Sequence, residues 1–156
     1  MNKISTRNHS GGSRFAPHGH VEIWAEGQLL RYQATGPFNL ELLQALDAAD
    51  RGLMAATAAQ GPFAILAEFA GSIAATPDAL AALEASLAAQ NAAGLASAAV
   101  AFVVDPDAEG AVLMRSIIAD IYARQGLPFG WFGTLDDARG WLAAQMAAAT
   151  TLVTSP

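Results

Sequence analysis

The stretch PFAILAEFAGSIAATPDALAALEASL, residues 62–87, combines a strand pattern and a helix pattern in one unit. Its apolar run at 62–69 is typical of a strand that is covered on both faces. A helix start follows at Thr76, Pro77 and Asp78, with a capping hydroxyl, a proline in the first turn and an early acid. Leucines at spacings of three and four come next, so the stretch predicts a strand, a loop and a helix in succession.

Strand and helix patterns alternate on both sides of this stretch. Apolar residues alternate at 21–25 and at 29–34 around a short break, which predicts a hairpin. Asn39 is a cap for a helix that ends at Gly61. Further strand, helix, strand and helix patterns occupy 96–104, 112–124, 129–133 and 134–149. This order predicts an α/β fold, with a mostly parallel sheet of about five strands, an N-terminal β-hairpin and four helices.

The chain is expected to form one domain. Its 156 residues suit a single core, and no linker divides the patterned part of the sequence. Residues 1–17 are polar and glycine-rich without apolar periodicity, which indicates a flexible N-terminal arm. We expect the domain at 18–148 and a fraying C-terminal tail at 149–156.

Composition excludes several classes of protein. A net charge of −6 with a single lysine argues against a nucleic-acid surface. The chain has no cysteine, so disulfides, thiolate nucleophiles and cysteine-bound metals are excluded. No apolar run is long enough to span a bilayer, and the first ten residues lack the apolar stretch of a secretory signal. These features predict a cytoplasmic protein of bacterial type.

Three segments carry a resemblance to a known family: HGHVEIWAEGQLLRYQATGPFN (18–39), PFAILAEF (62–69) and FGTLDDARGWL (132–142). They resemble the STAS / SpoIIAA-like proteins, and the resemblance covers 18–148 in the order of its elements. It implies a SpoIIAA-like βα superhelical domain that binds partners without catalysis of its own. Anti-sigma-factor antagonists of that family carry a phosphorylatable serine in an Asp-Ser stretch. The matching segment here, 69–80, lacks that pair, so the sequence is more similar to a lipid-carrier-like branch without the phospho-switch.

Candidate ligand-binding residues lie at strand ends, where α/β sheets place their ligands. A serine follows a glycine in the loop after the strand at 62–69, and the helix start beyond it would suit an anion. Glycines flank two aromatic residues in the last strand, an arrangement that can open and line an apolar cleft. The candidates are Gly71, Ser72, Thr76, Asp105, Trp131 and Phe132. The alternative explanations are an ordinary loop serine, helix caps and core packing.

Two further features concern metal binding and protein contacts. His18 and His20 are two residues apart and would share one side of an extended strand, but no acidic or cysteine ligand lies at a suitable spacing. We therefore predict no metal site and no cofactor, with these histidines as the alternative. Trp24 shares its strand face with two glutamates, so we expect it to be exposed and to mark an interaction surface.

Three functional hypotheses follow. The first is a non-catalytic binding module that acts through protein–protein interaction or self-association. The second is a carrier for a small apolar, amphiphilic or anionic ligand. The third, a hydrolase-like enzyme using Ser72 or Asp105, has the least support, because no G-x-S-x-G motif is present and every histidine lies in the first twenty residues.

Overall fold

The strands of this chain join into one mixed sheet. The computed structural model describes residues 2–9 and 17–154, and within them the six strands follow one another in the order β1-β2-β3-β4-β5-β6. The strands are β1 (Ile4–Ser5), β2 (His20–Glu26), β3 (Leu29–Thr35), β4 (Ala64–Ala70), β5 (Ala99–Val103) and β6 (Phe129–Phe132). Strands β1, β2 and β3 pair antiparallel, whereas β3 to β6 run parallel. The predicted α/β class and hairpin are confirmed, but the sheet is mixed and has one strand more than expected.

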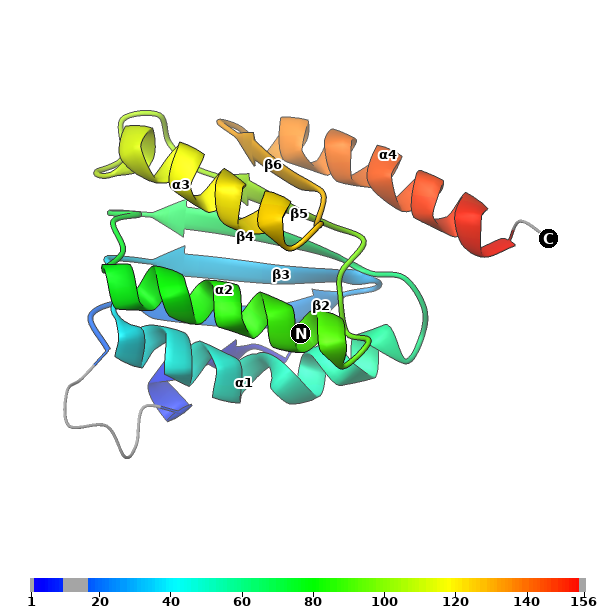
Figure 1. Ribbon diagram of the computed structural model, residues 1–156, viewed down its shortest axis with the longest axis horizontal. Helices are drawn as coiled ribbons and strands as arrows, with labels where there is room; N and C mark the ends of the chain where they lie inside the picture. The colour runs from blue at the N-terminus through cyan, green and yellow to red at the C-terminus, as the bar shows by residue number, and fades with distance from the viewer. Residues whose placement is uncertain (1, 10–16, 155–156) are drawn as a thin grey trace.

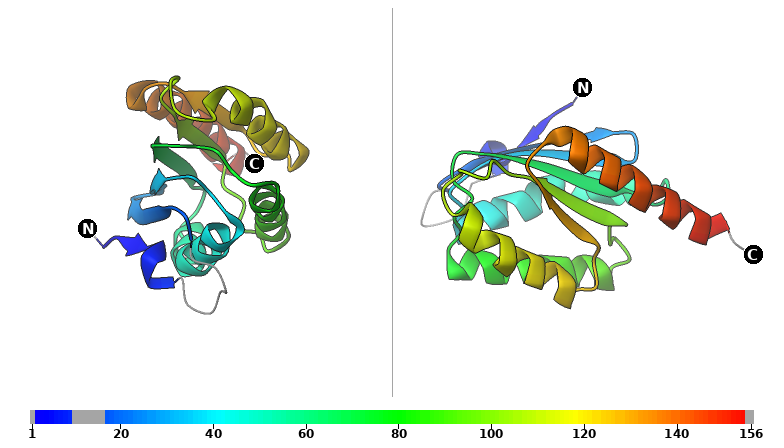
Figure 2. Two further views of the ribbon diagram at one scale, coloured as in Figure 1. Left: turned by 90° about the vertical axis from the view of Figure 1, so that its left-hand side faces the viewer. Right: turned by 90° about the horizontal axis from the view of Figure 1, so that it is seen from above.

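Helices cover both faces of this sheet. They are the short 3-10 helix η1 (Thr6–His9) and the α-helices α1 (Leu40–Ala58), α2 (Pro77–Ala92), α3 (Ala111–Arg124) and α4 (Leu135–Thr154). Helices α1, α2 and α3 each connect two neighbouring parallel strands and lie side by side on one face (Figure 1). Helix α4 lies on the opposite face (Figure 2), against β4, β5 and β6. None of the described helices combines the length and the apolar content needed to cross a bilayer.

Two apolar cores result, one on each face. Alternation along β4 sends Ala67 into the larger core beneath α1, α2 and α3, and Leu66 into the smaller core beneath α4. Both residues are buried. The apolar run at 62–69 therefore reflects a strand that is covered on both faces, as its pattern predicted.

The helix starts follow the local sequence. The Asn39 side chain accepts a hydrogen bond from the backbone N–H of Leu42 at 3.1 Å, and Thr76 does the same for Ala79 at 3.3 Å. Each cap satisfies a backbone donor that has no partner inside its helix. Both predicted caps are confirmed.

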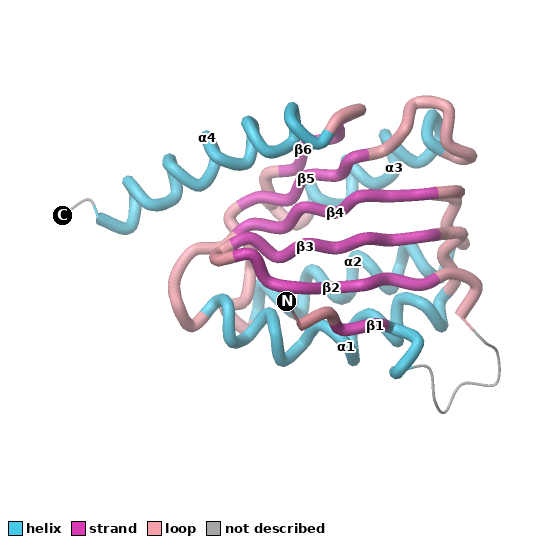
Figure 3. The backbone as a smooth tube through the Cα atoms, turned by 180° about the vertical axis from the view of Figure 1, so that it is seen from behind, coloured by secondary structure: helices cyan, strands magenta, loops and turns pink. Residues whose placement is uncertain are grey.

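The two ends of the chain have more regular structure than the sequence suggested. Ile4 pairs with Ile23 across β1 and β2, and Thr6 is buried, its hydroxyl oxygen accepting from the Val21 N–H at 2.9 Å. Helix α4 continues to Thr154, and its C-terminal part extends past the sheet (Figure 3). Regular structure thus replaces the predicted arm at 4–9 and the predicted tail up to residue 154; the rest of those predictions at 1, 10–16 and 155–156 lies outside the described residues.

Candidate functional site

The candidate residues of the loop after β4 are engaged in local contacts. The Ser72 hydroxyl donates to the carboxylate of Glu109 at 3.0 Å and accepts from the Ala74 N–H at 3.0 Å. Gly71 has a positive φ of 70°, a conformation that favours glycine. These contacts join the loop to the segment before α3, and they account for Ser72 as a loop residue.

Thr76 caps a helix, and Asp105 closes a turn in the loop before α3. Thr76 is the N-cap of α2, and Asp105 accepts from the backbone N–H of Asp107 at 2.9 Å. Both side chains are exposed, and each satisfies a nearby backbone donor. The helix cap that the sequence offered as the alternative is present at Thr76, whereas Asp105 does not cap α3, whose N-cap is Gly110.

Trp131 and Phe132 do not line a common cleft. Trp131 packs against Phe102 in the larger core, whereas Phe132 lies 5.6 Å from the Trp141 ring in the smaller core, on the other face of the sheet. A Cβ atom at Gly130 would overlap the Phe132 ring and stand 3.2 Å from Trp141. The glycine thus leaves room for the Phe132 and Trp141 rings, which fill the space. The prediction that Trp131 and Phe132 line one apolar cleft is therefore wrong.

Trp24 is buried, contrary to the prediction that it marks an exposed surface. Only 5% of it is exposed, because the Lys3 ammonium lies 4.5 Å from its ring centroid and the Arg31 guanidinium 5.2 Å. Arg31 is itself buried and forms ion pairs with Glu26 and Glu68.

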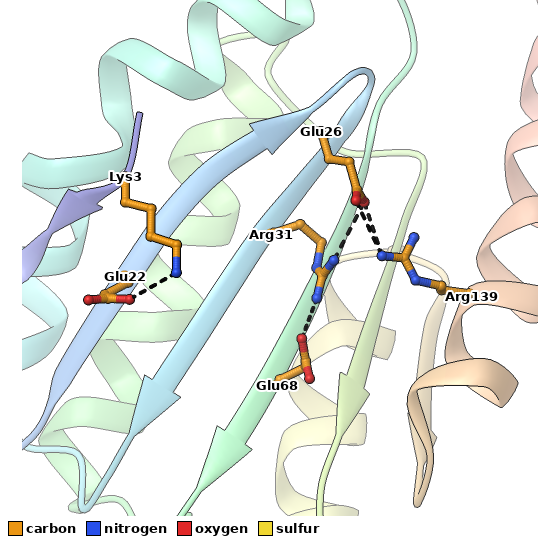
Figure 4. Close-up of polar contacts among 6 residues, drawn as sticks. All are labelled: Lys3, Glu22, Glu26, Arg31, Glu68 and Arg139. Carbon is orange, nitrogen blue, oxygen red and sulfur yellow. Dashed lines mark hydrogen bonds and ion pairs between the residues drawn. The ribbon is translucent and has the colours of Figure 1, made fainter. Parts of the chain in front are cut away.

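Figure 4 shows this charged network on the same face of the sheet as α4, mostly over strands that this helix does not cover. Arg139 extends it to α4 through an ion pair with Glu26 at 3.1 Å. Because these charges are largely matched within the chain, we assign the network a structural role.

The histidines considered as metal ligands do not form a cluster. His20 Nδ1 lies 3.3 Å from the Arg7 guanidinium, a donor that disfavours a cation beside it. His18 precedes β2 and is exposed. Within residues 2–9 and 17–154, no three His, Cys, Asp or Glu side chains gather at a distance suited to a metal ion.

A cavity not anticipated from the sequence lies in the larger core. It has a volume of about 140 Å³ and is partly open to solvent. Its walls come from the helix-facing side of β2 to β5, from α1, from α2 and from two residues of α3, and they are predominantly apolar. A mostly apolar hollow with a few placed polar groups is the usual form of a small-molecule site.

Small side chains create this cavity. Ala34 on β3 and Ala67 on β4 come from the two central strands of the sheet, and Ala75 before α2 and Ala79 in its first turn also line the cavity. Alanine fills less space than the aliphatic residues that usually pack a helix against a sheet. The alanine-rich composition therefore produces a hollow where α2 crosses the sheet.

The two carboxyl groups of the cavity both belong to α1. The Tyr32 hydroxyl donates to Asp50 Oδ2 at 3.0 Å, and both residues are buried. One turn earlier on α1, the half-buried Asp47 accepts from the Ser86 hydroxyl of α2. These two hydrogen bonds place two carboxyl groups, one deep and one near the rim, along one wall.

Burial controls the protonation of the deeper carboxyl group. Removal from water raises the pKa of Asp50 from 3.8 to about 7, and the hydrogen bond from Tyr32 opposes part of that rise. The pKa of Tyr32 is raised well above its usual value by burial, and then by the charge of Asp50. Near neutral pH, Asp50 thus exchanges between its protonated and ionised forms while Tyr32 remains a donor.

Tyr122 on α3 adds a second buried hydroxyl to the lining. It is 4% exposed, stacks on Phe129 at 4.5 Å, and burial raises its pKa. Among the described residues, the side-chain hydrogen bonds between residues of the cavity wall link Tyr32 with Asp50, Ser86 with Asp47 and Gln90 with Ser86, and none involves Tyr122.

The sequence carried one signal for this site. Asp50 follows Leu46 by four residues and precedes Leu53 by three, so it falls on the apolar stripe of its helix. An acidic residue at a core position is unusual enough to indicate a special environment.

Comparisons of the chain with protein-family models, with curated proteins and with solved structures found no match.

Proposed function

We propose that this chain is a non-catalytic binding module whose cavity between the sheet and helices α1 and α2 holds a small, largely apolar ligand. The observation that carries the proposal is the cavity itself, about 140 Å³ in volume. An engineered apolar cavity of about 150 Å³ takes up benzene, so a ligand portion of the size of one ring is expected.

The resemblance to STAS / SpoIIAA-like proteins belongs to this proposal. The predicted order of two strands, then helices alternating with strands, is found from β2 to α4, and this order supports the resemblance. A carrier role is the second of the hypotheses drawn from the sequence. It gains support over a hydrolase because Ser72 pairs with Glu109 and Asp105 closes a turn in its own loop.

Methyl NMR with toluene as the probe tests the proposal. We expect titration to shift the methyl signals of Leu46, Leu83 and Ile118, which line the cavity, and to leave Leu142 of α4, in the smaller core, unchanged. Ala67→Leu, which fills the cavity from β4, is the matched control and should abolish the shifts. Uniform small shifts on both faces, or shifts that persist in the filled variant, would contradict a specific site.

A second candidate function is self-association. Val112 is 89% exposed and Leu113 63% exposed, side by side in the first turn of α3. Exposed apolar side chains mark protein contacts where they form a contiguous patch. Sedimentation velocity of the wild type and of Val112→Ser/Leu113→Ser tests it: the wild type should sediment as a dimer and the variant as a monomer, whereas identical behaviour would dismiss the contact.

A further inference from the structure

The ionisable side chains that line the cavity include carboxyl groups but no basic group. Two carboxyl groups, Asp47 and Asp50, belong to its lining, and no lysine, arginine or histidine of the described chain does. None of the ion pairs found among the described residues includes either carboxylate. The cavity therefore presents unneutralised acidic groups to whatever enters it.

This arrangement discriminates between ligand charges. An anionic group would meet two carboxyl groups in a poorly solvated space, where repulsion is stronger than in water. A protonated amine would instead form a charge-assisted hydrogen bond with Asp50, which accepts from Tyr32 and is in none of the ion pairs found among the described residues. The anionic ligand suggested at the sequence level is thus disfavoured for this cavity.

We infer that the cavity selects small amphiphilic amines, with the ammonium group against Asp50 and an apolar portion of about one ring between β3, β4 and α2. This inference rests on the proposed function and specifies its ligand class. The apolar portion is accommodated by Ala34, Ala67 and Ala79, whose small side chains leave the space. Asp47 and Ser86 hydrogen-bond to each other nearer the rim, one turn of α1 away from Asp50.

Binding of an amine should depend on pH. The ionisable groups that share the cavity with Asp50 are Asp47 on α1, Tyr32 on β3 and Tyr122 on α3, and Arg51 adds a positive charge next to it on α1. Helix α2 contributes the uncharged Ser86 and Gln90. Since the ammonium pairs with the ionised form of Asp50, affinity should rise with pH and level off once that carboxyl group is ionised.

Three probes with the same ring test the inference: benzylamine, benzyl alcohol and benzoate, titrated by calorimetry and methyl NMR. At pH 8 we expect benzylamine to bind on the order of tenfold more tightly than benzyl alcohol, and benzoate to bind most weakly. At pH 5.5 the advantage of the amine should shrink to about threefold or less. Asp50→Asn should remove the preference for the amine and retain binding of benzyl alcohol.

The outcomes separate the inference from the proposed function. Equal affinity for the amine and the alcohol, or tighter binding of benzoate, would overturn the amine selectivity while leaving a ligand cavity in place. Failure of all three probes, together with failure of toluene, would overturn both. If Asp50→Asn does not fold, the pH series on the wild-type protein decides, because a pH-independent ratio between amine and alcohol also contradicts the inference.

Discussion

The hydroxyl of Tyr32 on β3 donates a hydrogen bond of 3.0 Å to Asp50 on α1, inside the larger core. The pair connects the sheet to its first helix by a polar contact where apolar packing would be expected. Its consequences are measurable because burial moves the titration of Asp50 into an accessible range of pH.

The first prediction concerns stability as a function of pH. The pKa of Asp50 is about 7 in the folded chain, above its value of 3.8 in an exposed setting. As pH rises from about 4 to about 7 the unfolded chain ionises first, so this group lowers the free energy of unfolding, by about 4 kcal/mol at most. Asparagine does not ionise, so the free energy of unfolding of Asp50→Asn should not fall for this reason. Urea denaturation should therefore show the variant gaining stability relative to the wild type as pH rises.

The control for this prediction is Asp120→Asn, an exposed acid on α3. Its stability difference from the wild type should vary much less over the same range of pH. A difference between Asp50→Asn and wild type that stays constant with pH would show that Asp50 does not titrate abnormally.

The second prediction separates the two buried tyrosines. Tyr32→Phe removes the hydrogen bond that lowers the pKa of Asp50, so this pKa should rise above its present value of about 7. Tyr122→Phe removes a hydroxyl that makes no described hydrogen bond to Asp50, and it should change that pKa less. Carboxyl ¹³C NMR titration measures the pKa of Asp50 in both variants. A larger change of this pKa in Tyr122→Phe than in Tyr32→Phe would mean that Tyr32 does not supply the hydrogen bond to Asp50.

Local patterns predicted the parts of this fold that local interactions determine. The caps at Asn39 and Thr76 depend on residues three positions apart, and both are present. The cavity depends on alanines from β3, β4 and α2 that come together only after folding, so the pattern of no single segment predicted it. The position of Asp50 on an apolar stripe was a local sign, but the partner Tyr32 comes from another element.

Trp24 illustrates the opposite limit. Its alternation with Val21 and Ile23 correctly placed it on the other face of the strand, where the tryptophan was expected to be exposed. The ring of Trp24 is covered by Arg31, its cross-strand partner on β3, and by Lys3, which belongs to a segment without apolar periodicity. Long charged side chains cover apolar surface in a way that a hydrophobic pattern does not report.

The third prediction uses one substitution on the two faces of the sheet. Ala67→Leu adds three carbons to the cavity and should stabilise the fold by about 1 kcal/mol, because apolar area is buried without displacing a neighbour. Ala101→Leu adds the same atoms beneath α4, where Ala101 is fully buried, and should destabilise by about 1–3 kcal/mol. Chemical denaturation measures the change in the free energy of unfolding for both variants. If both variants are destabilised equally, the cavity beside Ala67 has no room for the added carbons.

The fourth prediction concerns the buried guanidinium of Arg31. Arg31→Met leaves Glu68, which is 28% exposed at its side chain, without its cationic partner. We expect a loss of about 2 kcal/mol in the free energy of unfolding, below the range for fully buried pairs because water still reaches Glu68. The double variant Arg31→Met/Glu68→Met should recover most of that loss, since both charges are then replaced by apolar side chains.

Lys3→Met, in a pair whose partners are about two-fifths exposed, should change stability by less than about 1 kcal/mol. Additive losses in the double-mutant cycle would mean that Arg31 and Glu68 do not interact, and that Arg31 acts through its ion pair with Glu26 and its packing on Trp24.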